Sequence, residues 1–242
     1  MNLTPLKSLN FSKKARNKGK IKFLIIHYTG MQSMRASIKR LLSSKHKVSC
    51  HYLISREGKI FQMVEDCNIA WHAGKSKWGK LENLNINSIG IELVNKGHRF
   101  GYQKFPQKQI NALVRLCIKL KKKYKIKNPN ILGHSDIAPL RKFDPGEKFP
   151  WFKLKEKKIG IWYPLDLNKQ TSLFKKLRAN SIRKFFFKNL YKIGYRYFNK
   201  EKFSKTDIFI IKSFQRRFRQ EKVNGKIDLE CLKISDYLAK NH

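Results

Sequence analysis

One segment restricts the possible folds of this chain more than any other: KFLIIHYT, residues 22 to 29, is apolar on both faces that a strand presents. Strands with two apolar faces lie at the centre of sheets that are covered on both sides. Under the two-residue alternation of a strand, His27 shares one face with Phe23 and Ile25. The segment therefore predicts a central strand that ends in a histidine facing the protein interior.

Strands and helices alternate along the first 165 residues. Residues 33–42 predict a short helix, and residues 106–124 predict a longer one with apolar side chains at helical spacing. Two short strands are expected around a turn at residues 56–59, another strand in SIGIELVN, and a last one in NPNILGHSD that runs into a loop. This order is typical of an α/β domain with a mixed central sheet flanked by helices.

Only helical patterns follow. Ile211, Phe214 and Phe218 form one apolar stripe, and Asn224-Gly225 separates that helix from a final one. We predict three parts: a basic N-terminal segment over residues 1–20, the α/β domain over residues 21–165, and a small all-α domain over residues 166–242.

The formal net charge of +39 first suggests a nucleic-acid partner. The basic residues are spread along the whole chain, however, and no readout motif accompanies them, so no nucleic acid is expected. Biased codon usage explains such a composition, and the charge still favours an anionic partner such as a cell-wall polymer.

The four cysteines, Cys50, Cys67, Cys117 and Cys231, show no metal-ribbon spacing, and free thiols are expected. The sequence contains no apolar span long enough for a transmembrane helix and no recognisable signal peptide. Two locations stay open, the cytoplasm and the cell envelope or periplasm, and the envelope is slightly favoured.

Three residues form a candidate metal site: His27, His134 and Asp144. Imidazole and carboxylate are ligands that suit zinc, and three protein ligands leave one tetrahedral position open for chemistry. Asp144 follows His134 by ten residues across a loop that contains a proline, which is long enough to turn back. The other reading of each histidine is an ordinary core or surface residue, and His46, His98 and His242 are expected to be of that kind.

Several motifs in order, among them IIHYTG, SCHYLISREGKIFQMVED, AWHAGKSKW, SIGIELVN and GHSDIAPLRKFDPG, resemble the zinc-dependent N-acetylmuramoyl-L-alanine amidases of the AmpD/AmiD type. This family is related to the peptidoglycan recognition proteins. The resemblance covers residues 22–151 and implies that residues 21–165 form a zinc amidase domain. It also implies that His27, His134 and Asp144 hold a single Zn²⁺ ion.

The resemblance implies catalytic roles for two more residues. Glu92 would move a proton from the attacking water to the leaving nitrogen, and its place as the one charge in an apolar strand fits that role. Lys142 would stabilise the oxyanion, whereas Arg141 is expected to be solvated.

Four further residues are candidates for substrate binding: Trp71, His72, Tyr28 and His51. Trp71 and His72 lie in a loop that the resemblance places beside the cleft, with simple packing as the alternative. His51 and Tyr28 alternate with apolar residues, so support of the sheet beneath the site is an equal reading for both.

The resemblance implies hydrolysis of the amide bond between N-acetylmuramic acid, or its 1,6-anhydro form, and the L-alanine of the stem peptide, with peptidoglycan or muropeptides as partners. The alternative function is a recognition protein that binds muropeptides without cleaving them. The C-terminal stretch resembles a three-helix peptidoglycan-binding domain, and a helical cap that only covers the sheet is the other reading.

Overall fold

A computed structural model describes residues 3–12, 16–164 and 179–242 of the 242-residue chain. Its centre is a six-stranded sheet with the strand order β1-β5-β4-β9-β3-β10, in which only the β4–β5 pair is antiparallel. The strands of this sheet are β1 (Leu3–Pro5), β3 (Phe23–Tyr28), β4 (Tyr52–Ile54), β5 (Ile60–Gln62), β9 (Ser88–Leu93) and β10 (Ile131–Gly133).

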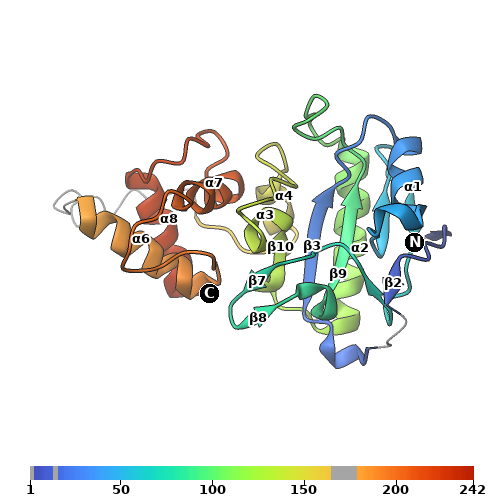
Figure 1. Cartoon of the computed structure of the whole chain (residues 1–242), viewed down its shortest axis with the longest axis horizontal. Helices are drawn as coiled ribbons and strands as arrows, with labels where there is room; N and C mark the ends of the chain where they lie inside the picture. Colours follow the sequence, from blue (N-terminus) through green and yellow to red (C-terminus); the bar gives the residue numbers. More distant parts are fainter. Residues whose placement is uncertain (1–2, 13–15, 165–178) are drawn as a thin grey trace.

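The strand predicted as central is β3, an interior strand that lies between β9 and the edge strand β10 and pairs in parallel with both. Its residues Leu24, Ile25 and Ile26 have no solvent exposure, as expected for a strand covered on both faces. Figure 1 shows β3 and β9 side by side in front of the long helix α2 (Gln107–Tyr124). Parallel pairing brings the carboxyl ends of β3, β9 and β10 to one edge of the sheet, where α/β proteins commonly bind ligands.

The remaining predicted elements of the α/β domain are present, with one difference. Helix α1 (Met34–Leu42) begins after Ser33, whose side chain accepts a hydrogen bond from the Ala36 amide. The loop predicted after β10 is wrong, because the short helix α3 (His134–Ile137) follows the strand directly. The carboxylate of Asp136 caps this turn by accepting a hydrogen bond from the Gly133 amide at 2.8 Å.

The described residues of the N-terminal segment, predicted as a separate basic part, pair with strands of the α/β domain, β1 in the six-stranded sheet and β2 (Phe11–Ser12) in a separate two-stranded sheet. Strand β1 pairs with β5, and β2 pairs with β6 (Ile69–Ala70). The Arg16 side chain is 5% exposed and donates hydrogen bonds to the carbonyls of Asp66, Asn85 and Ile86. These contacts join the segment to the α/β domain.

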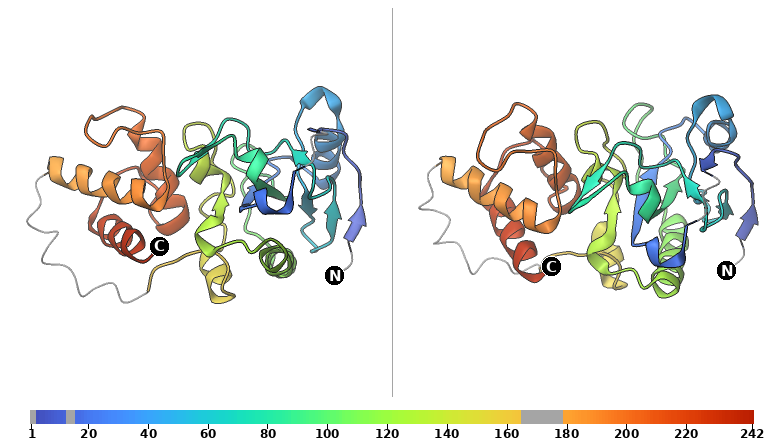
Figure 2. Two further views of the ribbon diagram at one scale, coloured as in Figure 1. Left: turned by 90° about the horizontal axis from the view of Figure 1, so that it is seen from below. Right: turned by 60° about the horizontal axis from the view of Figure 1, so that its bottom comes forward.

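The C-terminal part is helical, as predicted, with α6 (Ala179–Ile193), α7 (Asp207–Phe218) and α8 (Leu229–Asn241). Residues 166–178 of the predicted all-α domain lie outside the described residues. Figure 2 shows the three helices beside α3 and α4 (Trp151–Glu156) in both views. One hydrophobic core runs from the sheet through Phe149 and Trp151 into Phe214 and Phe218, so the helical part packs directly against the α/β domain.

All four cysteines are free thiols, and Cys67 is the exposed one. Within the part of the chain that the structure describes, no helix is both long enough and apolar enough to span a membrane.

Candidate metal centre and cleft

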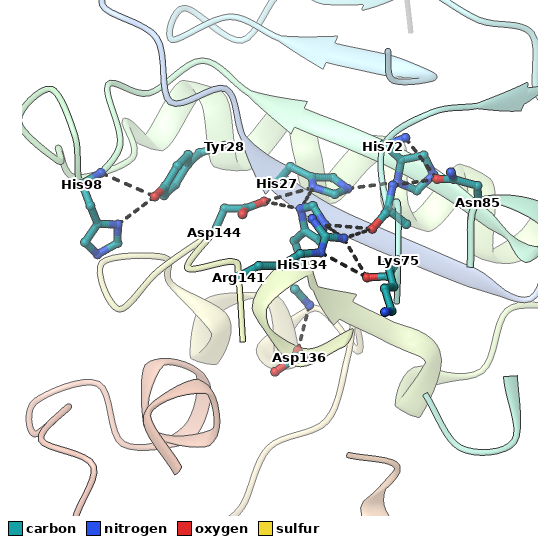
Figure 3. A network of polar contacts seen from close by, with 12 residues as sticks. His27, Tyr28, His72, Lys75, Asn85, His98, His134, Asp136, Arg141 and Asp144 are labelled. Atoms are coloured by element: carbon teal, nitrogen blue, oxygen red, sulfur yellow. Dashed lines mark hydrogen bonds and ion pairs between the residues drawn. The ribbon is translucent and has the colours of Figure 1, made fainter. Parts of the chain in front are cut away.

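Three side chains that the sequence predicts as metal ligands meet at the carboxyl edge of the sheet (Figure 3). His27 lies near the end of β3, His134 opens α3, and Asp144 lies ten residues later in the returning loop. The His27 Nδ1 atom is 2.9 Å from His134 Nδ1 and 3.0 Å from Asp144 Oδ2, and the last two atoms are 3.1 Å apart. All three residues are buried, so the predicted convergence is confirmed.

The three donor atoms are spaced like the ligands of one metal ion. Tetrahedral ligands about 2.0–2.1 Å from a zinc ion lie roughly 3.3 Å apart, which is close to the observed triangle. Burial and the facing His134 imidazole lower the pKa of His27 to about 4, so this ring is neutral near pH 7. Burial alone would raise the pKa of Asp144, but the two imidazoles outweigh it and hold that pKa below its ordinary value. Two imidazoles and one carboxylate are the donor set expected of a divalent cation site.

The outward nitrogens of both imidazoles have partners in one loop, residues 71–75. His134 Nε2 lies 3.2 Å from the Ala73 carbonyl oxygen, and His27 Nε2 lies 3.0 Å from His72 Nδ1. The loop itself is fixed by Asn85, whose side-chain oxygen accepts hydrogen bonds from the amides of His72 and Ala73. Such partners orient ligand imidazoles and select their tautomer.

The Glu92 carboxylate faces the same site from β9, where it stands in register beside His27. Its side chain reaches the cleft, but the Oε2 atom is shut off from solvent and has no hydrogen-bond partner among the described residues. Burial, and next the charge of Asp144, raise the pKa of Glu92 to about 8, against the opposing charge of Lys142. A carboxyl group that titrates near neutral pH can both accept and release a proton.

Lys142 and Arg141 both line the cleft. Arg141 is exposed, as expected, but its guanidinium also donates to the backbone carbonyls of Ala73 and Lys75. Arg141 thereby joins the loop that carries Asp144 to the loop that supports both histidines. Sequence reasoning missed it because its partners are backbone atoms about 66 residues away.

The cleft above the metal ligands has a volume of about 620 Å³. Tyr28 and Trp71, two predicted substrate-binding residues, line it with part of their surface exposed. The Trp71 indole N–H donates to Ser12 Oγ at 3.0 Å, which leaves the ring face for contacts in the cleft. Four basic side chains, Arg40, Arg99, Arg141 and Lys142, also line the cleft.

His72 and His51 differ from the other two candidates for substrate binding. His72 reaches the cleft wall but is only 8% exposed, and both of its ring nitrogens have protein partners. His51 has no exposure, its Nδ1 accepts the Gly90 amide proton, and burial and Arg16 lower its pKa to about 3. Direct substrate contact by His51 is therefore wrong, and support of the sheet is the reading that fits.

His98, expected to be an ordinary core or surface residue, is exposed, and it also lines the cleft wall. Its Nδ1 lies 2.8 Å from the Tyr28 hydroxyl oxygen, and its Nε2 lies 3.1 Å from a carboxylate oxygen of Glu147. The loop of His98 is thereby tied to the segment that follows Asp144. The sequence carries no signal for this contact, because His98 stands in a polar loop without periodic neighbours.

A family model described as N-acetylmuramoyl-L-alanine amidase matches residues 17–147, more than half of the chain, and this range includes every residue of the site. The chain belongs to the N-acetylmuramoyl-L-alanine amidase family. Over 155 residues, this amidase-family chain is 39% identical to the N-acetylmuramoyl-L-alanine amidase AmiD of Escherichia coli, covering 59% of this chain and 55% of AmiD. The 1,6-anhydro-N-acetylmuramyl-L-alanine amidase AmpD of Haemophilus influenzae is 42% identical over 106 residues, covering 43% of this chain and 55% of AmpD. The chain thus matches little more than half of the length of these curated relatives.

Two solved structures resemble the amidase-family chain over nearly its whole length. AmpDH3 from Pseudomonas aeruginosa has a TM-score of 0.83 at 31% identity, and the match covers 96% of this chain and 94% of AmpDH3. Escherichia coli AmiD, in complex with the substrate anhydro-N-acetylmuramic acid-L-Ala-D-gamma-Glu-L-Lys, has a TM-score of 0.80 at 32% identity, with coverage of 96% and 92%. The predicted family and the predicted fold class, a mixed sheet flanked by helices with an all-α C-terminal part, are confirmed.

Proposed function

We propose that this chain is a zinc-dependent amidase that hydrolyses the bond between N-acetylmuramic acid and the L-alanine of the peptidoglycan stem peptide. The observation that carries the proposal is the buried triangle of His27, His134 and Asp144, which opens into a cleft beside Glu92. The names of the similar proteins support this substrate class: AmpD is named for a 1,6-anhydro-N-acetylmuramyl compound, and the AmiD structure contains an anhydro-N-acetylmuramic acid peptide.

His27, His134 and Asp144 would hold the ion. When bound, zinc supplies Lewis-acid chemistry, which polarises an amide carbonyl and makes water more acidic. The residues around the site supply the rest. Glu92, with its pKa raised to about 8, would take a proton from the attacking water at its carboxylate and return it to the leaving nitrogen. Lys142 would stabilise negative charge on the carbonyl oxygen.

The cleft also fits the charge of the proposed substrate. Stem peptides carry carboxylates, and the basic side chains along the cleft, including Arg40 and Arg99, would attract them. Trp71 and Tyr28 offer flat amphipathic rings of the kind that bind sugars and peptide backbones. Binding of the wall by the C-terminal helices, and a location in the cell envelope, stay predictions that pulldown with intact sacculi and cell fractionation would check.

The decisive experiment compares the purified full chain with its Glu92→Gln variant, each loaded with zinc, on a soluble anhydromuropeptide and on intact sacculi. Mass spectrometry should find free stem peptide with the parent, and the rate should fall by about 10²–10⁴ in Glu92→Gln. Glu82→Gln, on the exposed strand β8 (Leu81–Glu82), is the matched control and should keep the parent rate.

The zinc content of each sample decides between the alternatives. A parent that binds zinc and muropeptide without releasing any product would be a recognition protein. A Glu92→Gln variant that cleaves as fast as the parent would remove Glu92 from the mechanism.

A further inference from the structure

A chain of four polar groups lies behind the metal ligand His27, and nothing in the proposed mechanism uses it. It runs from the Leu84 carbonyl through the Ser88 hydroxyl and the His72 ring to His27 Nε2. Ser88 has no solvent exposure, His72 is 8% exposed and His27 is 1% exposed. Buried polar groups of this kind must satisfy one another, so the direction of each hydrogen bond can be worked out.

The direction of these hydrogen bonds is set at the Leu84 end of the row of polar groups. The Leu84 carbonyl can only accept, so the single hydroxyl proton of Ser88 is donated to it across 2.5 Å. Toward His72 Nε2, which lies 3.2 Å away, the Ser88 oxygen must therefore accept. His72 carries its proton on Nε2 as a result.

The same reasoning continues through His72. His72 is buried, and among the described residues its two ring nitrogens face only His27 and the Ser88 hydroxyl, with no carboxylate to balance a positive charge. A buried imidazole without a counter-ion is neutral and has one proton. With that proton on Nε2, His72 Nδ1 is a bare acceptor. His27 Nε2, at 3.0 Å, must then be the donor, which leaves His27 Nδ1 without a proton and facing His134 and Asp144.

The strand β9 is shaped to hold this arrangement. Ser88, Gly90 and Glu92 alternate along one face of the strand, and β3 places His27 beside Glu92. A Cβ atom at Gly90 would overlap the His72 ring, so glycine is what allows the ring to pack closely against the strand. One strand thus provides the Ser88 hydroxyl, the space for the His72 ring, and the cleft carboxylate of Glu92.

We propose that His72 and Ser88 are positioning residues that fix the tautomer of His27, so that its Nδ1 lone pair is presented to the metal ion. This inference rests on the proposed metal site. It gives His72 a role different from the predicted contact with substrate. Partners that orient ligand histidines typically change metal affinity by about 10- to 100-fold when they are removed.

The test uses two nearly isosteric variants of the full chain. In His72→Asn an amide oxygen can replace the Nδ1 acceptor, whereas His72→Leu has a similar shape and no acceptor. We expect the zinc dissociation constant, measured by competition with a chromophoric chelator, to rise about 10- to 100-fold in His72→Leu. The zinc dissociation constant of His72→Asn should stay close to that of the parent. The constant of Ser88→Ala should lie between those of His72→Asn and His72→Leu.

A second measurement needs no metal. Nitrogen-15 spectra of the zinc-free parent should show the His27 proton on Nε2, and His72→Leu should show a mixture of tautomers. Equal losses of affinity in His72→Leu and His72→Asn would mean that the ring only fills space, and would overturn the inference. So would a His27 proton on Nδ1 in the parent. A parent that bound no zinc would count against the proposed function, while the spectrum would still decide the tautomer.

Discussion

The Arg217 guanidinium donates to the Asp136 carboxylate at 2.6 Å, and both side chains are at most 2% exposed. Arg217 belongs to the C-terminal helix α7, whereas Asp136 lies in α3, two residues beyond the candidate metal ligand His134. Tyr195 donates to the other oxygen of Asp136 at 2.7 Å, and Ser213 donates to the Ser135 carbonyl at 2.7 Å. The helical part therefore holds the turn that presents His134 to the cleft.

Replacing Arg217 with methionine should lower the free energy of unfolding by about 3–5 kcal/mol, because Asp136 would remain buried without its charge partner. Urea unfolding of the parent and the variant measures this loss. Lys77→Met, which removes an exposed ion pair with Glu82, should leave the urea midpoint unchanged.

A double variant, Arg217→Met with Asp136→Asn, should recover part of that stability, because no unpaired charge is then buried. If the double variant instead loses as much free energy of unfolding as the two single variants lose together, the ion pair itself is not the source of the effect.

Lys142→Met should reduce kcat by about 10²–10³ with little change in zinc affinity, since Lys142 lines the cleft without belonging to the metal triangle. Steady-state kinetics on an anhydromuropeptide, together with zinc titration, measures both quantities. Lys108→Met, on the exposed face of α2, is the matched control. A fall confined to zinc affinity would assign Lys142 to metal binding instead of oxyanion stabilisation.

Gly90→Ala should destabilise the protein by about 1–3 kcal/mol, because the new methyl group would overlap the His72 ring in a packed interior. It should also weaken zinc binding by moving His72 away from His27. Gly19→Ala is the control, since a Cβ atom at Gly19 meets nothing within 4 Å. Thermal unfolding with and without zinc separates the two effects, and an unchanged Gly90→Ala would show that the ring has room to move.

The pH dependence of stability should depend strongly on Asp66, which lies far from the cleft. Burial opposes its ionisation, but hydrogen bonds from Lys123, Tyr124 and Tyr52 outweigh burial and lower the pKa of Asp66. A lowered pKa in the folded state stabilises the fold above the unfolded value of about 4, and this contribution is lost as the pH falls below it.

Asp66→Asn should therefore lower the free energy of unfolding by about 1–3 kcal/mol at neutral pH. This difference from the parent should shrink as the pH falls below about 4. Urea unfolding at a series of pH values measures it. Glu156→Gln, at the exposed end of α4, should keep the pH profile of the parent. A constant difference between parent and Asp66→Asn at all pH values would contradict the electrostatic explanation.

The sequence predicted those features that depend on local periodicity or on several motifs in order. The apolar pattern on both faces predicted β3 as an interior strand of the sheet, and the resemblance predicted that His27, His134 and Asp144 share one site. The contacts of Arg141 and the Arg217–Asp136 pair could not be predicted in this way, because each joins segments about 66 to 81 residues apart without a periodic signal. His51 was open to two readings, because alternation along a strand does not say which face meets the cleft.

The shared core between the sheet and the helices has a consequence for how such a protein can be recombined. Suppose that the C-terminal helices α6 to α8, the tail of the protein, served only as a tether. The tail could then be exchanged for another by joining the two chains anywhere in the connecting segment. Here the tail supplies an arginine, a tyrosine and a serine to the turn that bears His134. A chimera would keep a formed metal site only if its new tail brought equivalents of all three.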